Sequence, residues 1–305
     1  MPADQDTATP RPQSLMLSFF GIHVLGRDVA LSSGGVIDAF ARVRVSEEAV
    51  RSTLTRMVGR GLLERHRRGR KTYFGLTDRA KTVLTDGQDR IWRTGAVNRE
   101  WDGSWTVVGF SLPDAWRRER HDLRSRLVWG GFAPLQSGLW TAPGRVDVAA
   151  LVDGLGLEGH LRVFHGRAAA PTEAGDLLAA FDVPAIADRY RGFLDRWSTG
   201  TAQDATAPDA APDATAPDTA APGTTATVPA EDDLARQLLL HTDWLELVRG
   251  DPHLPAEHLP ADWPAEAAEQ LFRSLAHRYR PGAEAIAAGI LDRIELAPEG
   301  TAPLG

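Results

Sequence analysis

A set of small, polar and cationic side chains is spaced to lie on one face of a single helix. Ser46 is a favourable N-cap and Gly61 suits the left-handed position that ends a helix, so we expect a helix from Glu47 to Arg60. Arginine, serine and threonine can reach base edges and phosphates in a major groove, from which bulky side chains would be excluded. The apolar stripe consists of Val50, Leu54, Met57 and Val58, and we expect the opposite face to contact DNA through Arg51, Ser52, Thr55 and Arg56.

A β-hairpin with a cationic tip is expected directly after this helix. Its strands are Leu62–His66 and Thr72–Leu76, and Gly69 supplies the positive φ that a tight turn needs. A hairpin of this kind lies along a phosphate backbone or probes a minor groove. The alternative is an exposed hairpin whose charges only protect the sheet edge. The cations expected to contact the DNA backbone are Arg67, Arg68, Arg70 and Lys71.

The segments around these two elements complete a winged helix-turn-helix domain over residues 14–95. We expect a buried helix over Ser14–Leu25 with Ser14 as N-cap, a short strand at Val29–Leu31, and a helix over Gly35–Ala41. A further helix capped by Thr77 is expected to run through Trp92. The helix Glu47–Arg60 would then be the recognition helix and the hairpin the wing.

The charge distribution supports a local anion-binding surface. The chain of 305 residues has a net charge of −7, which alone argues against a nucleic-acid partner. Residues 1–100, however, carry 17 Lys and Arg against 11 Asp and Glu, whereas the remaining residues carry 17 against 30. Within residues 42–81 the count is 12 against 4. Attraction for anions is therefore confined to the region of the expected helix and hairpin.

Beyond residue 95 the pattern predicts a ferredoxin-like α+β domain over residues 96–170 and a helical domain over 171–295. The chain as a whole is therefore expected to be of the α+β class. Residues 199–229 are low in complexity, rich in Ala, Thr, Pro and Asp, and expected to be a disordered insertion. The last helical region is expected to end at Ile294. In the middle domain we expect strands at Trp105–Leu112, Phe132–Trp140 and His160–His165, with helices at Asp114–Trp129 and Val146–Leu155.

Several ordered motifs together resemble the PaaX-type repressors of phenylacetate catabolism. The first pair is Ala49-Val-Arg-Ser-Thr-Leu-Thr-Arg-Met-Val-Gly-Arg-Gly-Leu-Leu63 and Arg67-Arg-Gly-Arg-Lys-Thr-Tyr-Phe-Gly-Leu-Thr77. Others are Trp101-Asp-Gly-Ser-Trp105, Gly138-Leu-Trp140, Arg249-Gly-Asp-Pro-His-Leu-Pro255 and Trp263-Pro264. The likeness covers about residues 14–279, and the low-complexity segment departs from the family pattern.

The resemblance implies a transcriptional regulator and not an enzyme. It implies a homodimer that binds a palindromic double-stranded DNA operator and represses transcription. It also implies release by an acyl-CoA effector, with phenylacetyl-CoA as the familiar case. No effector-binding residue is assigned from the sequence.

Catalytic and cofactor motifs are absent from the sequence. It contains no cysteine, Walker loop, GxGxxG after a strand, or HExxH. His253 and His258 share a proline-rich loop without a carboxylate set, so no metal site and no cofactor are expected. Asp251 is interpreted as a turn or helix-capping residue. A polar N-terminus without a long apolar run favours a cytoplasmic protein over a secreted or membrane protein. Two alternatives stay open: a metal-dependent nuclease that uses Asp114 of the middle domain, and a winged-helix scaffold that binds only protein.

Overall fold

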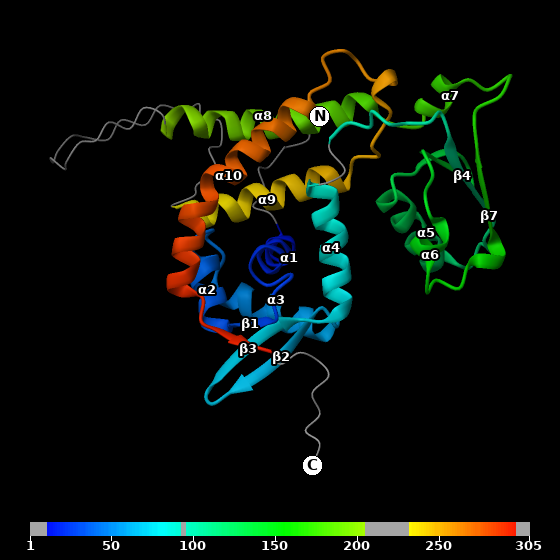
Figure 1. Ribbon diagram of the computed structural model, residues 1–305. Helices are drawn as coiled ribbons and strands as arrows, with labels where there is room; N and C mark the ends of the chain where they lie inside the picture. The colour runs from blue at the N-terminus through cyan, green and yellow to red at the C-terminus, as the bar shows by residue number, and fades with distance from the viewer. Residues whose placement is uncertain (1–10, 93–95, 205–231, 297–305) are drawn as a thin grey trace, which may run out of the picture. The chain divides into compact units, whose positions relative to one another are not determined.

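The computed structural model describes residues 11–92, 96–204 and 232–296, and its fold is α+β with two antiparallel four-stranded sheets (Figure 1). The expected α+β class is therefore confirmed. The chain divides into two compact units: unit 1 is Met1–Asp89, Gly192–Leu245 and Gln270–Gly305, and unit 2 is Arg90–Arg191 and Glu246–Glu269. Within the described ranges, no helix has the length and apolar character needed to cross a membrane.

Unit 1 combines the N-terminal part of the chain with helices from its C-terminal part. Ser14 is not the N-cap of the first helix, because that helix begins two residues earlier with a proline in its first turn. The N-terminal elements are α1 (Pro12–His23), β1 (Val29–Ser32), α2 (Ser33–Ala41), α3 (Glu47–Gly59), β2 (Leu63–Arg68), β3 (Lys71–Leu76) and α4 (Asp78–Trp92). The later ones include parts of α8 (Val183–Asp204), α9 (Asp233–Arg249) and α10 (Ala265–Ile290), followed by β8 (Arg293–Glu295).

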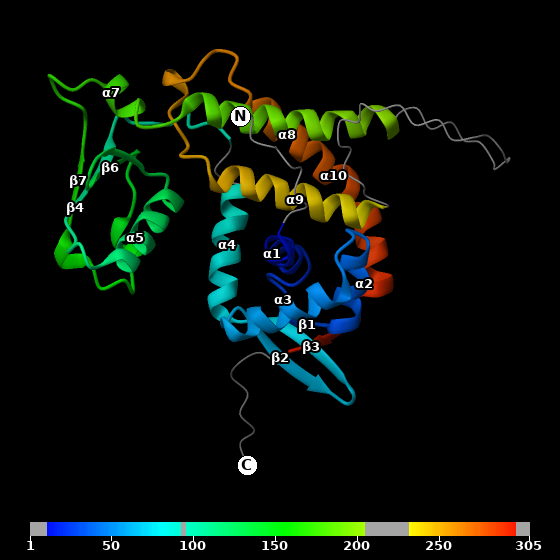
Figure 2. The same ribbon diagram turned by 180° about the vertical axis from the view of Figure 1, so that it is seen from behind.

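Helix α1 is the centre of unit 1. It is apolar on nearly all sides, and Leu15, Met16, Phe19 and Phe20 are fully buried. A helix that is hydrophobic all round must be covered all round. Figures 1 and 2 show α1 end-on, with α2, α3, α4 and α9 around it. The ring of Phe19 meets that of Phe40 in α2 edge to face, with centroids 5.4 Å apart.

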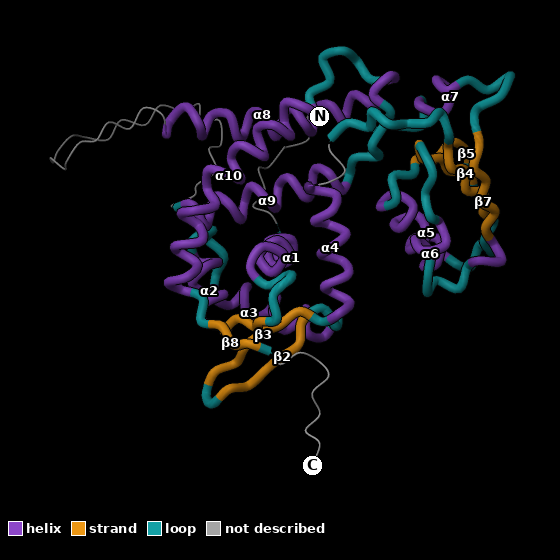
Figure 3. The backbone as a smooth tube through the Cα atoms, viewed as in Figure 1, coloured by secondary structure: helices purple, strands orange, loops and turns teal. Residues whose placement is uncertain are grey.

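The sheet of unit 1 has the strand order β2-β3-β1-β8 (Figure 3). β1 pairs antiparallel with β3 through Leu31 and Phe74, and on its other edge it pairs with β8, where Ala30 lies opposite Ile294. The expectation of helix up to Ile294 is thus wrong. α10 ends at Ile290, and the chain then turns into a strand that hydrogen-bonds to residues more than 260 positions earlier in the sequence.

Unit 2 contains the second sheet, with the strand order β5-β6-β4-β7. The segment expected to be one strand, Phe132–Trp140, is a hairpin that turns at Ser137 and at Gly138, whose φ is +76°. Leu123 and Leu127 of α5 are fully buried in a core that also contains Val108 and Trp140. The elements are β4 (Trp105–Phe110), α5 (Arg117–Trp129), β5 (Ala133–Gln136), β6 (Leu139–Pro143), α6 (Val148–Val152), β7 (Leu161–Gly166) and α7 (Ala174–Leu178), with short 3-10 turns at Glu158–His160 and Ala256–His258.

The low-complexity segment is only partly described. α8 continues to Asp204, so residues 199–204 are helical where disorder was expected. The rest of the expected insertion, residues 205–229, lies outside the described residues. The division into domains at residues 14–95, 96–170 and 171–295 stays a prediction.

The start of α2 passes so close to the end of α10 that one glycine has no room for a side chain. A Cβ on Gly35 would lie 2.8 Å from the carbonyl oxygen of Ile290 and 3.2 Å from the Cα of Leu291. Both neighbours are backbone, which cannot rotate away. At Gly34 a Cβ would meet nothing within 4 Å.

We expect Gly35→Ala to lower the free energy of unfolding by about 1–3 kcal/mol, the usual cost of forcing an extra methyl into packed structure. Gly34→Ala, the matched control, should be neutral or stabilising, because alanine favours a helix by up to about 1 kcal/mol over glycine. Urea unfolding of the two variants measures the difference. Equal effects would contradict the close approach of α2 and α10.

Two buried histidines make the stability of unit 1 sensitive to acid. Burial lowers the pKa of His241 from 6.5 to about 4. The pKa of His23 is also lowered to about 4, first by burial and then by the nearby charges of Arg27 and Arg293. Their rings pack on Phe272 and Phe19, with centroids 5.3 and 4.7 Å apart. Both side chains are therefore neutral in the folded protein at pH 7.

We expect the free energy of unfolding to fall as the pH is lowered from about 6.5 to about 4. In this window the unfolded chain takes up protons that the folded protein excludes, and each histidine contributes up to about 1.4 kcal/mol per pH unit. Above about pH 6.5 this stabilisation is complete. Denaturant unfolding at several pH values tests it: His241→Gln should flatten the profile, and an unchanged slope in that variant would show that His241 is not responsible.

Candidate nucleic-acid interface

Helix α3 forms as its sequence signals dictate. The hydroxyl of Ser46 accepts a hydrogen bond from the backbone N–H of Ala49 at 3.3 Å, and Gly61 follows the helix with φ +67°. Val50, Leu54 and Met57 are buried against the rest of unit 1. The expected helix and its caps are therefore confirmed, and the last helical residue is Gly59 with Arg60 as C-cap. The other face is exposed and presents the four expected side chains, Arg51, Ser52, Thr55 and Arg56.

These four side chains line one shallow hollow together with Glu47 and Glu48. The guanidinium of Arg51 lies 2.6 Å from a carboxylate oxygen of Glu47, and the hydroxyl of Thr55 donates to the carbonyl of Arg51 at 2.9 Å. Arg56 donates to Thr53 at 3.1 Å. The two acidic residues at the rim went unnoticed as part of this surface in the sequence. Their i, i+4 spacing to Arg51 and Ser52 is the signal that could have revealed them.

The hairpin β2–β3 is longer and its turn shorter than the sequence suggested. Arg67 pairs with Thr72 and Arg68 with Lys71, so only Gly69 and Arg70 form the turn. Gly69 has φ +60°, which is the conformation that a two-residue hairpin turn requires at its first position. The side chains of Arg67, Arg68, Arg70 and Lys71 are all exposed. The expected cationic tip is thus present, with two of its cations in a cross-strand pair.

One hollow brings the hairpin tip, α3 and the start of α2 together. Arg51, Arg70 and Lys71 line it, along with Ser33, Gly34 and Asp292. Lys71 forms an ion pair in this hollow. Its ammonium donates to the carboxylate of Asp292 at 2.8 Å, and the hydroxyl of Tyr73 donates to the same oxygen at 3.1 Å. The hydrogen bond to Asp292 raises the pKa of Lys71, and the hydrogen bonds from Lys71 and Tyr73 lower the pKa of Asp292.

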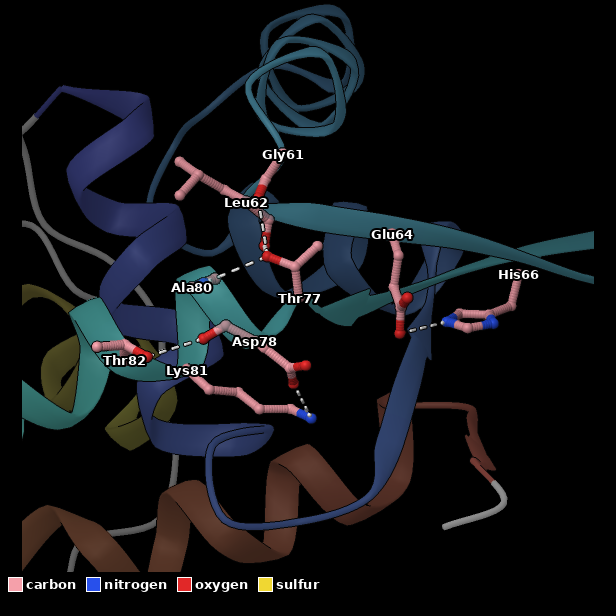
Figure 4. A network of polar contacts seen from close by, with 9 residues as sticks. All are labelled: Gly61, Leu62, Glu64, His66, Thr77, Asp78, Ala80, Lys81 and Thr82. Atoms are coloured by element: carbon pink, nitrogen blue, oxygen red, sulfur yellow. Dashed lines mark hydrogen bonds and ion pairs between the residues drawn. The ribbon is translucent and has the colours of Figure 1, made fainter. Parts of the chain in front are cut away.

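A threonine hydroxyl joins the end of α3, the hairpin and the start of α4 (Figure 4). Thr77 donates to the carbonyl of Gly61 at 2.8 Å, with the carbonyl of Leu62 at 3.3 Å, and accepts from the N–H of Ala80 at 3.2 Å. The expected N-cap of α4 is confirmed. The same hydroxyl also donates to the link between α3 and the hairpin, so α3 and the hairpin hold a fixed relation to α4.

The residues considered for metal or catalytic chemistry lie in other surroundings. Asp114 is fully exposed and its carboxylate is 3.9 Å from Arg120. His258 packs on the ring of Trp101, with centroids 5.2 Å apart. Asp251 accepts from the backbone N–H of His253 at 2.7 Å, which confirms it as a turn residue. Within the described part of the chain, no three His, Asp or Glu side chains are grouped so that they could hold a metal ion.

Comparison with known families gives three matches along the chain. Residues 11–80 match the model of a PaaX-like protein, residues 98–178 the PaaX protein central Cas2-like domain, and residues 215–289 the PaaX-like protein C-terminal domain. The chain belongs to the PaaX family. The expected relationship is thereby confirmed, and every candidate residue on α3 and the hairpin lies in the first matched range.

Individual relatives are distant but similar in length. The chain is 24% identical over 272 residues to the transcriptional repressor PaaX of Escherichia coli (strain K12), which covers 88% of this chain and 81% of the relative. Among solved structures, the uncharacterized protein Rv0674 from Mycobacterium tuberculosis matches with a TM-score of 0.56 and 21% identity, covering 91% of this chain and 99% of that one. This last likeness concerns the fold alone.

We expect Thr77→Val to lower the free energy of unfolding by about 1–2 kcal/mol, because it removes the cap of α4 and leaves the carbonyl of Gly61 without the hydroxyl donor. Thr77→Ser should retain most of the stability. Thr82→Val is the matched control, since Thr82 donates only to the carbonyl of Asp78 within the exposed first turns of α4. Equal losses at both positions, measured by urea unfolding, would contradict the assigned role of Thr77.

Proposed function

We propose that the chain is a sequence-specific DNA-binding transcriptional regulator that acts as a repressor. The observation that carries the proposal is the exposed face of α3, with two arginines among small polar residues, followed at once by an exposed cationic hairpin. Membership of a family that includes a transcriptional repressor places the chain among regulators of transcription and not among enzymes. A regulator that binds genomic DNA would work in the cytoplasm.

We interpret α1 to α4 with the hairpin as a winged helix-turn-helix. In this arrangement α2 precedes the recognition helix α3 by a short turn, and the hairpin, residues 63–76, is the wing. The recognition helix of such a domain lies in the major groove with the residues near its N-terminus at the base edges. Arg51, Ser52 and Thr55 lie in the first half of α3 or just beyond it, which fits that docking. Arg56 and the wing cations would contact phosphates.

The order of elements in unit 2 supports the ferredoxin-like interpretation of the middle domain. Strand, helix, strand, strand, helix, strand is followed from β4 to β7, and β4 lies between β6 and β7 in the sheet. We further propose a homodimer that places two copies of α3 in successive major grooves about 34–36 Å apart. A palindromic operator would match this two-fold symmetry.

Release from DNA would follow from an acyl-CoA effector such as phenylacetyl-CoA, the class that the family resemblance implies. Such a ligand can lower operator affinity only if it binds more tightly to a conformation that does not bind DNA. The coupling is therefore a difference between two affinities, which a titration of the DNA complex measures directly.

Fluorescence anisotropy with the duplex from the protein's own upstream region, a random duplex and a salt series tests the proposal. We expect tight and selective binding that weakens steeply as salt rises. Phenylacetyl-CoA added to the specific complex should then release the DNA. Absence of binding to either duplex at low salt would overturn DNA binding and favour a protein-interaction scaffold.

Arg51→Ala should weaken binding to the specific duplex by about 1–3 kcal/mol and relax the preference for one base pair, if Arg51 makes a bidentate base contact. The ion pair with Glu47 does not oppose this, since exposed i, i+4 pairs contribute only about 0.3–0.5 kcal/mol. Arg118→Ala removes an exposed arginine from α5 and is the control expected to leave binding unchanged. Equal losses for Arg51→Ala on specific and random duplexes would contradict a base contact.

A further inference from the structure

The end of the chain contributes a strand and a negative charge to the surface proposed to bind DNA. The C-terminal segment, residues 291–296, follows α10 and forms β8 beside β1 (Figure 3). Asp292 lies at its start and contacts both Lys71 and Tyr73 of the wing. The family match ends at residue 289, just before this segment. A carboxylate thus lies within the most cationic part of the molecule.

Main-chain pairing fixes the position of Asp292 independently of its side chain. The backbone N–H of Ser32 donates to the carbonyl of Asp292 at 2.8 Å, and the N–H of Leu296 donates to the carbonyl of Asp28 at 2.8 Å. Between these bonds Arg293, Ile294 and Glu295 pair with β1. The residue before the segment, Ile290, packs against Gly35 at the start of α2. The backbone of Asp292 is therefore held in place beside the wing, which keeps its carboxylate within reach of Lys71.

Lys71 is therefore in a different situation from the other cations of the wing. Its side chain is two-thirds exposed, and its ammonium lies 2.8 Å from the carboxylate of Asp292, whose side chain is 43% exposed. Such an ion pair contributes little to stability in water. We expect the ion pair to affect DNA binding more than it affects stability. The carboxylate of Asp292 cancels the charge of Lys71 and repels a DNA phosphate that would take its place beside Lys71.

We propose that Asp292 is a positioning residue that keeps Lys71 from contacting a DNA phosphate and so limits the sequence-independent affinity of the wing. This inference rests on the proposed DNA-binding function and changes it at one residue, because Lys71 is no longer counted among the wing cations that contact phosphate. Arg67, Arg68 and Arg70 remain the phosphate contacts of the wing, and Lys71 becomes available only when Asp292 is neutralised or the C-terminal segment leaves β1.

The test is the dependence of binding to a random duplex on salt concentration. For duplex DNA each phosphate neutralised by the protein adds about 0.9 to the slope of log K against log salt. Asp292→Asn should steepen the slope by about 0.9. The affinity of this variant relative to that of the wild type should therefore be about 3.5-fold higher at 50 mM than at 200 mM salt. Lys71→Ala should change the slope little in the wild type and should abolish the gain in the Asp292→Asn background.

Two further variants separate this role from a structural one. Asp292→Glu keeps the carboxylate and should restore the wild-type slope. Glu295→Gln removes the same charge from the same segment, at the position opposite Val29, and should have a smaller effect than Asp292→Asn. Thermal unfolding of each variant checks that the fold is intact, since a misfolded wing would flatten the slope and not steepen it.

Two results would overturn the inference. If Lys71→Ala lowers the wild-type slope by about 0.9 and Asp292→Asn leaves it unchanged, Lys71 contacts phosphate in the presence of Asp292. If no variant binds either duplex at 50 mM salt, the proposed function itself fails and the inference with it. The first result leaves DNA binding in place, so the two failures are distinguishable.

Discussion

Strand β1 is four residues long, and both of its edges carry a hydrogen-bonded partner. On one edge β3 brings the hairpin, and on the other lies β8, the strand that follows α10. An isolated two-stranded hairpin is at best marginally stable in water. The hairpin therefore takes its position from β1, and β1 runs without a break into α2, whose first turn is capped by Ser32. The direction of the cationic tip is set by this continuous backbone.

The same constraint ties the hairpin to α3. Leu62 donates from its backbone to the carbonyl of Met57 at 2.9 Å, and Thr77 donates to the carbonyl of Gly61 at 2.8 Å. The chain thus enters and leaves the hairpin at hydrogen bonds to the end of α3. The proposed docking, with α3 in a groove and the hairpin on the DNA backbone, needs this rigid relation, because contacts to the backbone set the register of contacts to the bases.

The parts of the fold that local signals determine could be predicted from the sequence. Helix α3 is bounded by Ser46 and Gly61, whose effects on the backbone act within three residues, and both boundaries are confirmed. The hairpin turn at Gly69 is local in the same sense. The turn at Gly138 was missed because apolar residues continue on both sides of it, and only the structure shows that a Cβ there would lie 2.6 Å from the carbonyl of Phe110.

What the sequence could not reveal depends on contacts between distant residues. A three-residue strand such as β8 has too few positions for an alternating pattern, and its partner β1 is only one residue longer. The contact between Lys71 and Asp292 spans 221 positions. The candidate residues on α3 and the hairpin were found because their exposure follows from helix and strand periodicity. The acidic neighbours of these residues were not found. Glu47 and Glu48 lie close enough in the sequence to have been recognised, whereas Asp292 does not.

Charge counted along the chain therefore overstates the cationic character of the surface. The count of 12 basic against 4 acidic residues over positions 42–81 omits Asp292, which lies against the wing. It also counts Arg42, whose guanidinium contacts Asp232, another acidic residue outside this range. Each of these anions lies beside a cation whose charge it offsets, so the field that a phosphate meets is set by fewer cations than the sequence contains. For the proposed DNA complex of a chain with a net charge of −7, such offsets predict that base contacts, more than general attraction for phosphate, decide where the protein binds.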